Sequence, residues 1–96
     1  MKLVYSEDAV TDLSRLRAFI AEKDPEAASR VASELLARIE NLCQFPHIGV
    51  EVAQAPEPGA LRDMVFGNYI VRYAAQQQTL IILRIWHHFE NRGDGN

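Results

Sequence analysis

The sequence predicts an α+β domain in which an N-terminal strand and a helical hairpin precede a three-stranded antiparallel meander. Apolar residues recur every three or four positions between residues 13 and 42, which is the helical period. From residue 61 onward, short runs of strand-forming residues alternate with turn residues, as in consecutive antiparallel strands. The length of 96 residues fits a single domain, which we assign to residues 1–96.

The N-terminal half predicts one strand and the start of a helical hairpin. Residues 2–5 alternate between polar and apolar and favour a short strand. Ser6 is a good helix N-cap, and the acidic residues that follow it suit the positive end of the helix dipole. The apolar stripe of this first helix consists of Leu13, Leu16, Phe19 and Ile20.

The second helix is predicted to begin at Asp24-Pro25, because Asp is a good N-cap and Pro is favoured at the first helical position. It is predicted to end at Phe45-Pro46. The segment 47–60, HIGVEVAQAPEPGA, carries two prolines and two glycines and is long for a simple connection. We expect it to be a binding or covering segment without regular structure. The apolar stripe of the second helix is Ala28, Val31, Leu35, Ile39 and Leu42.

The C-terminal third predicts the meander. Residues 80–83 are apolar at every position, so both faces of the last strand should be covered. The helices would cover one face, and a partner chain is a natural candidate for the other. The expected strands are Leu61–Phe66, Tyr69–Ala74 and Thr79–His87, with turns at Gly67-Asn68 and Ala75–Gln78.

Composition excludes several classes. Hydrophobic residues make up 48% and charged residues 24%, which is typical of a globular chain and not of a disordered one. No apolar run approaches the ~20 residues of a membrane-spanning helix, and the first residues do not resemble a signal peptide, so we expect a cytoplasmic protein without membrane contact. The single cysteine, Cys43, rules out an internal disulfide. The net charge of -3 disfavours extensive nucleic-acid binding by the whole molecule.

Two adjacent histidines end the last predicted strand. His87 and His88 point to opposite faces of a strand and cannot share one metal ion without distortion, so we expect no metal site and no cofactor. An imidazole has a pKa suited to a general base in RNA cleavage. Alternatively, His87 simply ends the strand and caps the packing of Trp86.

Arginines near these histidines are candidates for binding. Arg62 could clamp a phosphate or a carboxylate, or could form a structural ion pair with Glu90 or Asp63. Arg84 would lie on the open face of the sheet together with Trp86 and His88, where a partner could stack on it.

The stretches GALRDMVFGNYIVRY and ILRIWHHFENR, in this order after the helical hairpin, resemble the RelE/ParE superfamily of bacterial type II toxins. The resemblance covers nearly the whole chain. It implies a toxin that a cognate antitoxin holds inactive in a hetero-oligomeric complex.

The superfamily has two branches. The branch similar to RelE cleaves messenger RNA on the ribosome and tends to carry an arginine where this chain has Ile70, often with a C-terminal Tyr or His. The branch similar to ParE inhibits DNA gyrase without cleaving a substrate. Ile70, the absence of tyrosine after Tyr73 and the net negative charge therefore favour the gyrase inhibitor.

The sequence thus predicts a non-enzymatic inhibitor of DNA gyrase that is neutralised by an antitoxin, and the alternative is a ribosome-dependent messenger RNA endonuclease. In the alternative, the catalytic residues are Arg62, Arg84 and His87. The residues expected to bind the target or the antitoxin are Arg62, Arg84, Trp86, His88, Phe89 and Arg92.

Overall fold

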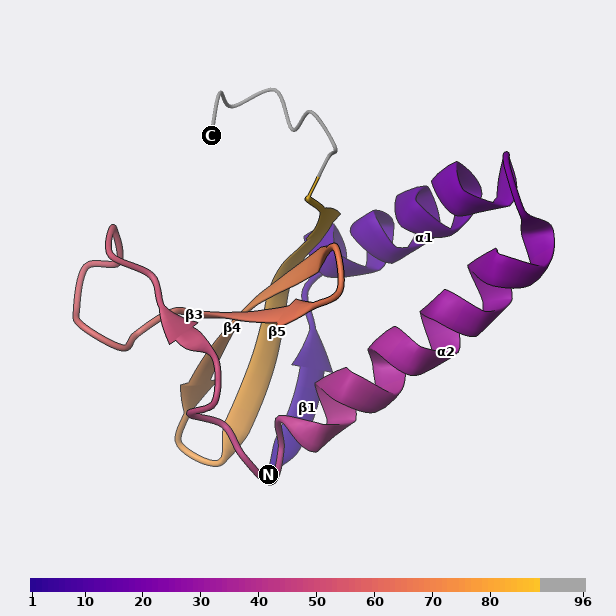
Figure 1. Ribbon diagram of the computed structural model, residues 1–96. Coiled ribbons are helices and arrows are strands. Elements are labelled where there is room, and N and C mark those ends of the chain that lie inside the picture. Colours follow the sequence, from indigo (N-terminus) through magenta and orange to yellow (C-terminus); the bar gives the residue numbers. More distant parts are fainter. Residues whose placement is uncertain (89–96) are drawn as a thin grey trace.

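In the computed structural model, which describes residues 1–88, two helices form a hairpin on one side of a five-stranded sheet (Figure 1). The α+β class and the order of the predicted elements are confirmed, and one further short strand, β2, lies between α2 and the meander. The helices are α1 (Glu7–Ala21) and α2 (Pro25–Asn41). The strands are β1 (Lys2–Tyr5), β2 (Val50–Glu51), β3 (Arg62–Phe66), β4 (Tyr69–Gln76) and β5 (Thr79–His87).

Both predicted helix starts are confirmed. The Ser6 hydroxyl accepts a hydrogen bond from the Ala9 N–H at 3.0 Å, and the Asp24 carboxylate accepts one from the Ala27 N–H at 3.1 Å. These caps satisfy amide groups that have no partner within the first turn of a helix. The hairpin therefore begins where the local sequence chemistry places it.

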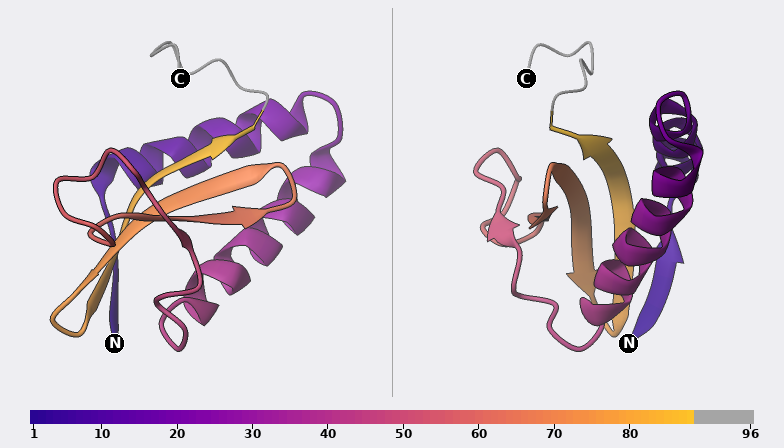
Figure 2. Two further views of the ribbon diagram at one scale, coloured as in Figure 1. Left: turned by 60° about the vertical axis from the view of Figure 1, so that its left-hand side comes forward. Right: turned by 45° about the vertical axis from the view of Figure 1, so that its right-hand side comes forward.

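The sheet is mixed, with the strand order β1-β5-β4-β3-β2. Strand β1 pairs with β5 in parallel, from Lys2 opposite Thr79 to Tyr5 opposite Ile82. The other pairs are antiparallel. The right-hand panel of Figure 2 shows β1 and β2 at opposite sides of the sheet. The meander β3–β4–β5 is thus the centre of a larger sheet, because β1 pairs with β5 on one side and β2 pairs with β3 on the other.

The core lies between the helices and the sheet. Strand β5 contributes most to it, since Leu80, Ile82 and Ile85 are fully buried. A β-bulge between Arg72 and Tyr73 shifts the register of β4 and β5. As a result, the buried positions of β5 change from even to odd residue numbers along the strand.

Three local predictions were wrong. Strand β4 extends to Gln76, and the turn contains only Gln77 and Gln78, both at positive φ (45° and 68°). Segment 47–60 contains the two-residue strand β2, which pairs with the start of β3. Helix α2 ends at Asn41 and not at Phe45-Pro46, so the half-buried Cys43 lies in the turn that follows the helix.

The chain between β2 and β3 projects from the sheet on the side away from the helices (Figure 1). In this segment Val52 is buried, and its N–H donates to the Leu61 carbonyl at 3.0 Å. In the described part of the chain, no helix is long and apolar enough to span a bilayer.

Candidate functional site

The three residues that a nuclease would use do not converge. Arg62 lies opposite Tyr73 and therefore shares its face, the face of the helix–sheet core. Arg84 precedes the buried Ile85 and starts from the other face. His87 points to the helix side again. Across the sheet, however, the β3 residue in line with His87 is four residues, about 13 Å, away from Arg62.

Arg62 fastens the chain that leaves α2. Its Nη1 donates to the carbonyl oxygens of His47 at 3.2 Å and Gly49 at 2.9 Å. Its Nη2 lies 3.6 Å from Glu51 Oε2. Of the two ion-pair partners suggested by the sequence, Asp63 binds Arg72 instead, and Glu90 lies outside the described residues. These contacts give Arg62 a structural role.

Tyr73 supports the same segment from within the core. Its hydroxyl donates to the Pro46 carbonyl at 2.8 Å and accepts from the Gly49 N–H at 3.0 Å. Tyr73 and its strand neighbour Val71 are both fully buried and belong to the core. Burial raises the pKa of Tyr73, so its phenol stays neutral and able to donate.

His87 packs among aromatic rings on the helix side. Its ring centroid lies 5.0 Å from that of Tyr69, edge to face, and 5.9 Å from that of Phe19 in α1. His87 ends β5 as predicted, but the expectation that it caps Trp86 is wrong, because adjacent strand residues face opposite sides. These two ring contacts are those of a packing residue.

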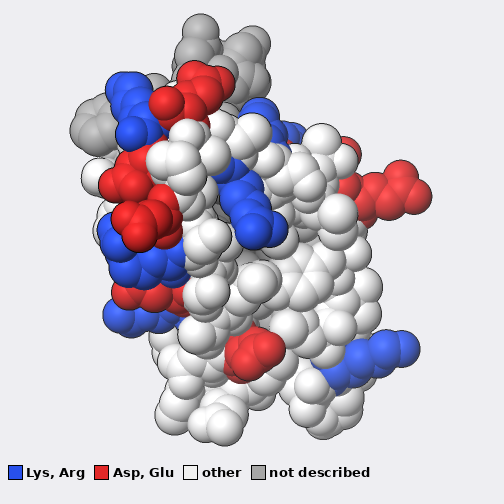
Figure 3. Space-filling model, turned by 90° about the vertical axis from the view of Figure 1, so that its right-hand side faces the viewer, with Lys and Arg blue, Asp and Glu red and all other residues white. Residues whose placement is uncertain are grey.

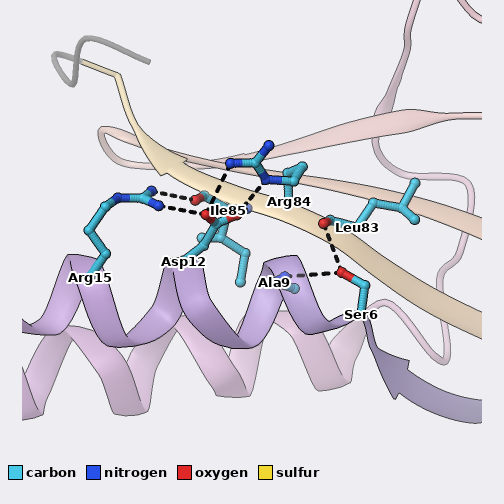
Figure 4. Close-up of polar contacts among 7 residues, drawn as sticks. All are labelled: Ser6, Ala9, Asp12, Arg15, Leu83, Arg84 and Ile85. Atoms are coloured by element: carbon cyan, nitrogen blue, oxygen red, sulfur yellow. Dashed lines mark hydrogen bonds and ion pairs between the residues drawn. The ribbon is translucent and has the colours of Figure 1, made fainter. Parts of the chain in front are cut away.

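Arg84 is bound to a buried carboxylate that sequence reasoning missed. Its Nε donates to Asp12 Oδ2 at 2.8 Å and its Nη2 to Oδ1 at 3.1 Å (Figure 4). Asp12 is 1% exposed. One feature of the sequence could have revealed it: Asp12 lies on the buried stripe of α1 between Ala9 and Leu16, where a carboxylate needs partners.

Asp12 also takes part in closing the outer edge of β5. Beyond the end of β1, no strand among residues 1–88 pairs with this edge, and side chains of α1 and its cap bind the backbone instead. The Asp12 carboxylate accepts from the Ile85 N–H at 2.8 Å, and Arg15 Nη2 donates to the Ile85 carbonyl at 3.2 Å. The Ser6 hydroxyl donates to the Leu83 carbonyl at 2.9 Å. An acceptor and a donor from a helix thus replace those of a neighbouring strand.

The ion pairs decide the charge state of Asp12. Burial alone would raise the pKa of this carboxyl, but hydrogen bonds from Arg84, the Ile85 N–H and Arg15 outweigh burial and lower the pKa below its ordinary value. In return, the hydrogen bond to Asp12 raises the pKa of Arg84. Both groups are therefore charged at neutral pH.

On the open face of the sheet, which is the face away from the helices, Arg72 covers Trp86. Trp86 is 6% exposed, and the guanidinium carbon of Arg72 lies 5.3 Å from its ring centroid. Arg72 donates from Nε and Nη2 to the two oxygens of Asp63, at 2.9 and 3.0 Å. Trp86 is thus on the predicted face, but a side chain of the same sheet shields it from solvent.

Next to Trp86, the open face has a hollow of about 430 Å³. His88 is exposed at its rim, and the His88 N–H donates to the Asn68 carbonyl at 2.5 Å. Val65 in its lining is 64% exposed. The hollow is lined by Val65, Gly67, Asn68, Ile70 and His88. Phe89 and Arg92, also predicted to bind a partner, lie outside the described residues.

The helix side offers a second, smaller groove. Figure 3 shows charged side chains gathered along one margin of this side, whereas the middle is largely uncharged. A groove of about 140 Å³ between the helices is lined by Leu13, Ser14, Arg17, Ala32 and Leu36. Among residues 1–88, no group of three or more His, Cys, Asp or Glu side chains could hold a metal ion.

The fold and these surfaces define a small α+β domain with exposed apolar and charged patches and with its candidate catalytic residues dispersed. Residues 3–92 match the family described as the ParE toxin of the type II toxin-antitoxin system parDE, and the chain belongs to this family within the RelE/ParE superfamily. It is the toxin of a type II toxin-antitoxin system, which implies an antitoxin partner.

Similar proteins agree with this assignment. Toxin RelE1 of Caulobacter vibrioides is 30% identical over 92 residues, which cover 94% of this chain and 96% of that toxin. Toxin RelE3 of the same organism is 31% identical over 85 residues, covering 84% and 87%. Among solved structures, the chromosomal ParDE system from P. aeruginosa superimposes with a TM-score of 0.74 at 19% identity, covering 91% of this chain and 95% of that one, and shows the same fold.

Proposed function

We propose that this toxin acts in the cytoplasm by protein–protein contact on DNA gyrase and that its antitoxin neutralises it by binding. The separation of Arg62, Arg84 and His87 carries this proposal. Cleavage of an RNA phosphodiester needs a base, an acid and cations around one phosphate. Two of these three side chains are engaged in polar contacts of the fold, and the third packs among aromatic rings.

The position of Ile70 supports the same conclusion. It lies beside Trp86 on the open face, where the resemblance places an arginine in the nuclease branch. An aliphatic side chain there cannot stabilise a developing phosphate charge. With the exposed Val65, it provides instead an apolar surface of the kind that anchors protein contacts.

The residues proposed to contact gyrase or the antitoxin are those predicted from the sequence, but their roles differ. Arg84 and His88 are exposed and are proposed to contact a partner directly. Arg62 and Trp86 are proposed to support the contact surface without touching the partner. Arg62 fixes the backbone of residues 47–49, and Trp86 lies under the Arg72 guanidinium. Phe89 and Arg92 keep their proposed role in binding.

A supercoiling assay tests the target. Purified gyrase, relaxed plasmid and ATP are incubated with wild-type toxin released from its antitoxin, and we expect inhibition that added antitoxin reverses. Exposed Arg30 on α2 gives a control variant, Arg30→Gln, which should inhibit as well as the wild type. Normal supercoiling in the presence of folded toxin would reject gyrase as the target.

A second candidate is the ribosome-dependent messenger RNA endonuclease, because the curated relatives bear the name RelE. Primer extension on ribosome-bound messages tests it. We expect no new toxin-dependent 5′ ends. New ends that disappear in His87→Ala would establish the nuclease instead.

The antitoxin should also stabilise the toxin. A ligand that binds only the native state raises stability by mass action. We expect a higher thermal midpoint for the hetero-oligomeric complex than for the toxin alone, and equal midpoints would contradict it.

A further inference from the structure

Strand β1 forms one side of the sheet, and its outward backbone groups are unpaired within residues 1–88. The N–H groups of Lys2 and Ser6 donate toward β5 and the turn before it, at 2.7 and 2.9 Å. Parallel pairing with one neighbour uses every second residue of a strand, so the N–H and C=O groups of Leu3 and Tyr5 point away from β5. In the described part of the chain, no other backbone group bonds to them.

The rest of the sheet boundary is different. Beyond the end of β1, the outer edge of β5 is occupied by side chains of Ser6, Asp12 and Arg15. At the opposite side of the sheet, β2 has only two residues. Strand β1 has four residues and is an outer strand over its whole length, as the right-hand panel of Figure 2 shows. An unpaired edge of this kind is a template for an additional strand.

The side chains of β1 indicate what such a strand would contain. Leu3 lies opposite Leu80 and Tyr5 opposite Ile82, and both β5 residues are fully buried. Leu3 and Tyr5 are half-buried and pack against this core. An added strand would place alternate side chains next to them on the helix side, where apolar groups would extend the core. The edge therefore suits an extended segment with apolar residues at alternate positions.

The length of β1 indicates which partner supplies this segment. Its four residues span about 13 Å, so two copies of the chain paired along this edge would bury much less than the ~1,200 Å² of a stable interface. A folded target would first have to release a strand from its own sheet and leave backbone groups unpaired. A segment that becomes ordered on binding can wrap over a large surface and add a strand here as one part of it. Among these partners, the antitoxin is the best match.

We propose that the outer edge of β1 is a strand-addition site for an extended segment of the antitoxin. This inference rests on the toxin–antitoxin pairing and is independent of whether gyrase is the target. The segment pairs with the outward N–H and C=O groups of Leu3 and Tyr5 and extends the five-stranded sheet by one strand. Main-chain hydrogen bonds hold it, and its apolar side chains pack beside Leu3 and Tyr5 on the helix side.

Amide hydrogen exchange, followed residue by residue by NMR on the full-length toxin with and without its antitoxin, tests the site. The N–H groups of Leu3 and Tyr5 should exchange readily in the free toxin and at least about 10-fold more slowly in the complex. The N–H of Val4 points toward β5 and provides the internal control, because it should be protected in both states. Unchanged exchange of Leu3 and Tyr5 in the complex would overturn the proposal.

A pair of variants at one position tests whether the outward N–H itself is used. Leu3→Pro removes this N–H, which an edge strand tolerates because the group faces solvent, whereas Leu3→Val keeps it. We expect Leu3→Pro to weaken the complex about 10-fold or more and Leu3→Val to change it by less than about 3-fold. Circular dichroism shows whether both variants are folded. Equal affinities of the two folded variants would contradict strand addition, and the exchange experiment on the wild type decides if Leu3→Pro does not fold.

Other occupants of the edge give different results. Protection of Leu3 and Tyr5 that rises with the concentration of the free toxin would show pairing between two copies and would overturn the proposal. Protection by gyrase but not by the antitoxin would overturn it as well. Failure of the wild-type toxin to bind the antitoxin at all would contradict the pairing itself.

Discussion

Side chains bind backbone groups at two junctions between the helices and the sheet, but the two junctions use different chemistry. At the α1 junction, Asp12 and its partners close the outer edge of β5 with a buried charge. At the α2 exit, Tyr73 and Arg62 bind the backbone of residues 46–49 through a neutral phenol and a guanidinium. The first junction depends on ionisation and the second on shape. This difference determines how each responds to substitution and to pH.

The largest effect is expected at the α1 junction. Asp12→Ala leaves the Ile85 N–H, Arg15 and Arg84 without their shared acceptor, and breaking a buried ion pair costs about 3–5 kcal/mol. For a domain of this size the thermal midpoint should fall by more than about 10 °C. Calorimetry measures it. The exposed acid Glu34 provides the control, since Glu34→Ala should change stability by less than about 0.5 kcal/mol.

The next effect tests shape at the α2 exit. A Cβ atom on Gly49 would lie 2.6 Å from the Tyr73 hydroxyl, 2.8 Å from its ring and 3.0 Å from the Asp63 carbonyl. Tyr73 is fully buried and cannot move aside, so Gly49→Ala should cost about 2–3 kcal/mol in urea unfolding. Gly67→Ala meets no atom within 4 Å and should cost about 1 kcal/mol from its positive φ alone. Equal losses for the two variants would refute the steric account.

A smaller loss is expected for Tyr73→Phe. This change removes one hydroxyl and leaves the Gly49 N–H and the Pro46 carbonyl without it, at a cost of about 1–2 kcal/mol. Because the missing oxygen also relieves the closest contact of a Cβ on Gly49, the double variant Gly49→Ala with Tyr73→Phe should lose less than the sum. Strict additivity in the same urea experiments would argue against direct coupling.

The smallest effect concerns pH. The pKa of Asp12 is lowered in the folded state, so the unfolded chain takes up this proton at higher pH than the native protein does. The stability contributed by Asp12 is complete above the unfolded pKa, near 4, and is lost as pH falls through the folded pKa. Asp12→Asn should therefore show a shallower fall in stability below pH 4 than the wild type. Tyr73→Phe should retain the wild-type slope, because the phenol stays neutral over this range.

Most of the fold could be predicted from the sequence, but fewer of the contacts at the candidate site could. The caps at Ser6 and Asp24, the apolar stripes and the Gly67-Asn68 turn are local features, and each lies where expected. Arg84 and His88 were identified as exposed residues of the open face. The partners of Arg62 and Arg84 were not, because contacts between residues 12 and 84 or 47 and 62 have no local sequence pattern.

By itself, the sequence determined which segments become helices and strands and in what order, apart from the short β2, since capping chemistry, apolar period and turn residues act over a few neighbouring positions. Only the tertiary structure decided that β1 returns to pair with β5 and that α1 then lies along the rest of the β5 edge. That placement turns Asp12 from an ordinary helical acid into a buried acceptor. It also gives Arg84 a fixed orientation, because a carboxylate removed from water must be paired with the charges and donors that reach it.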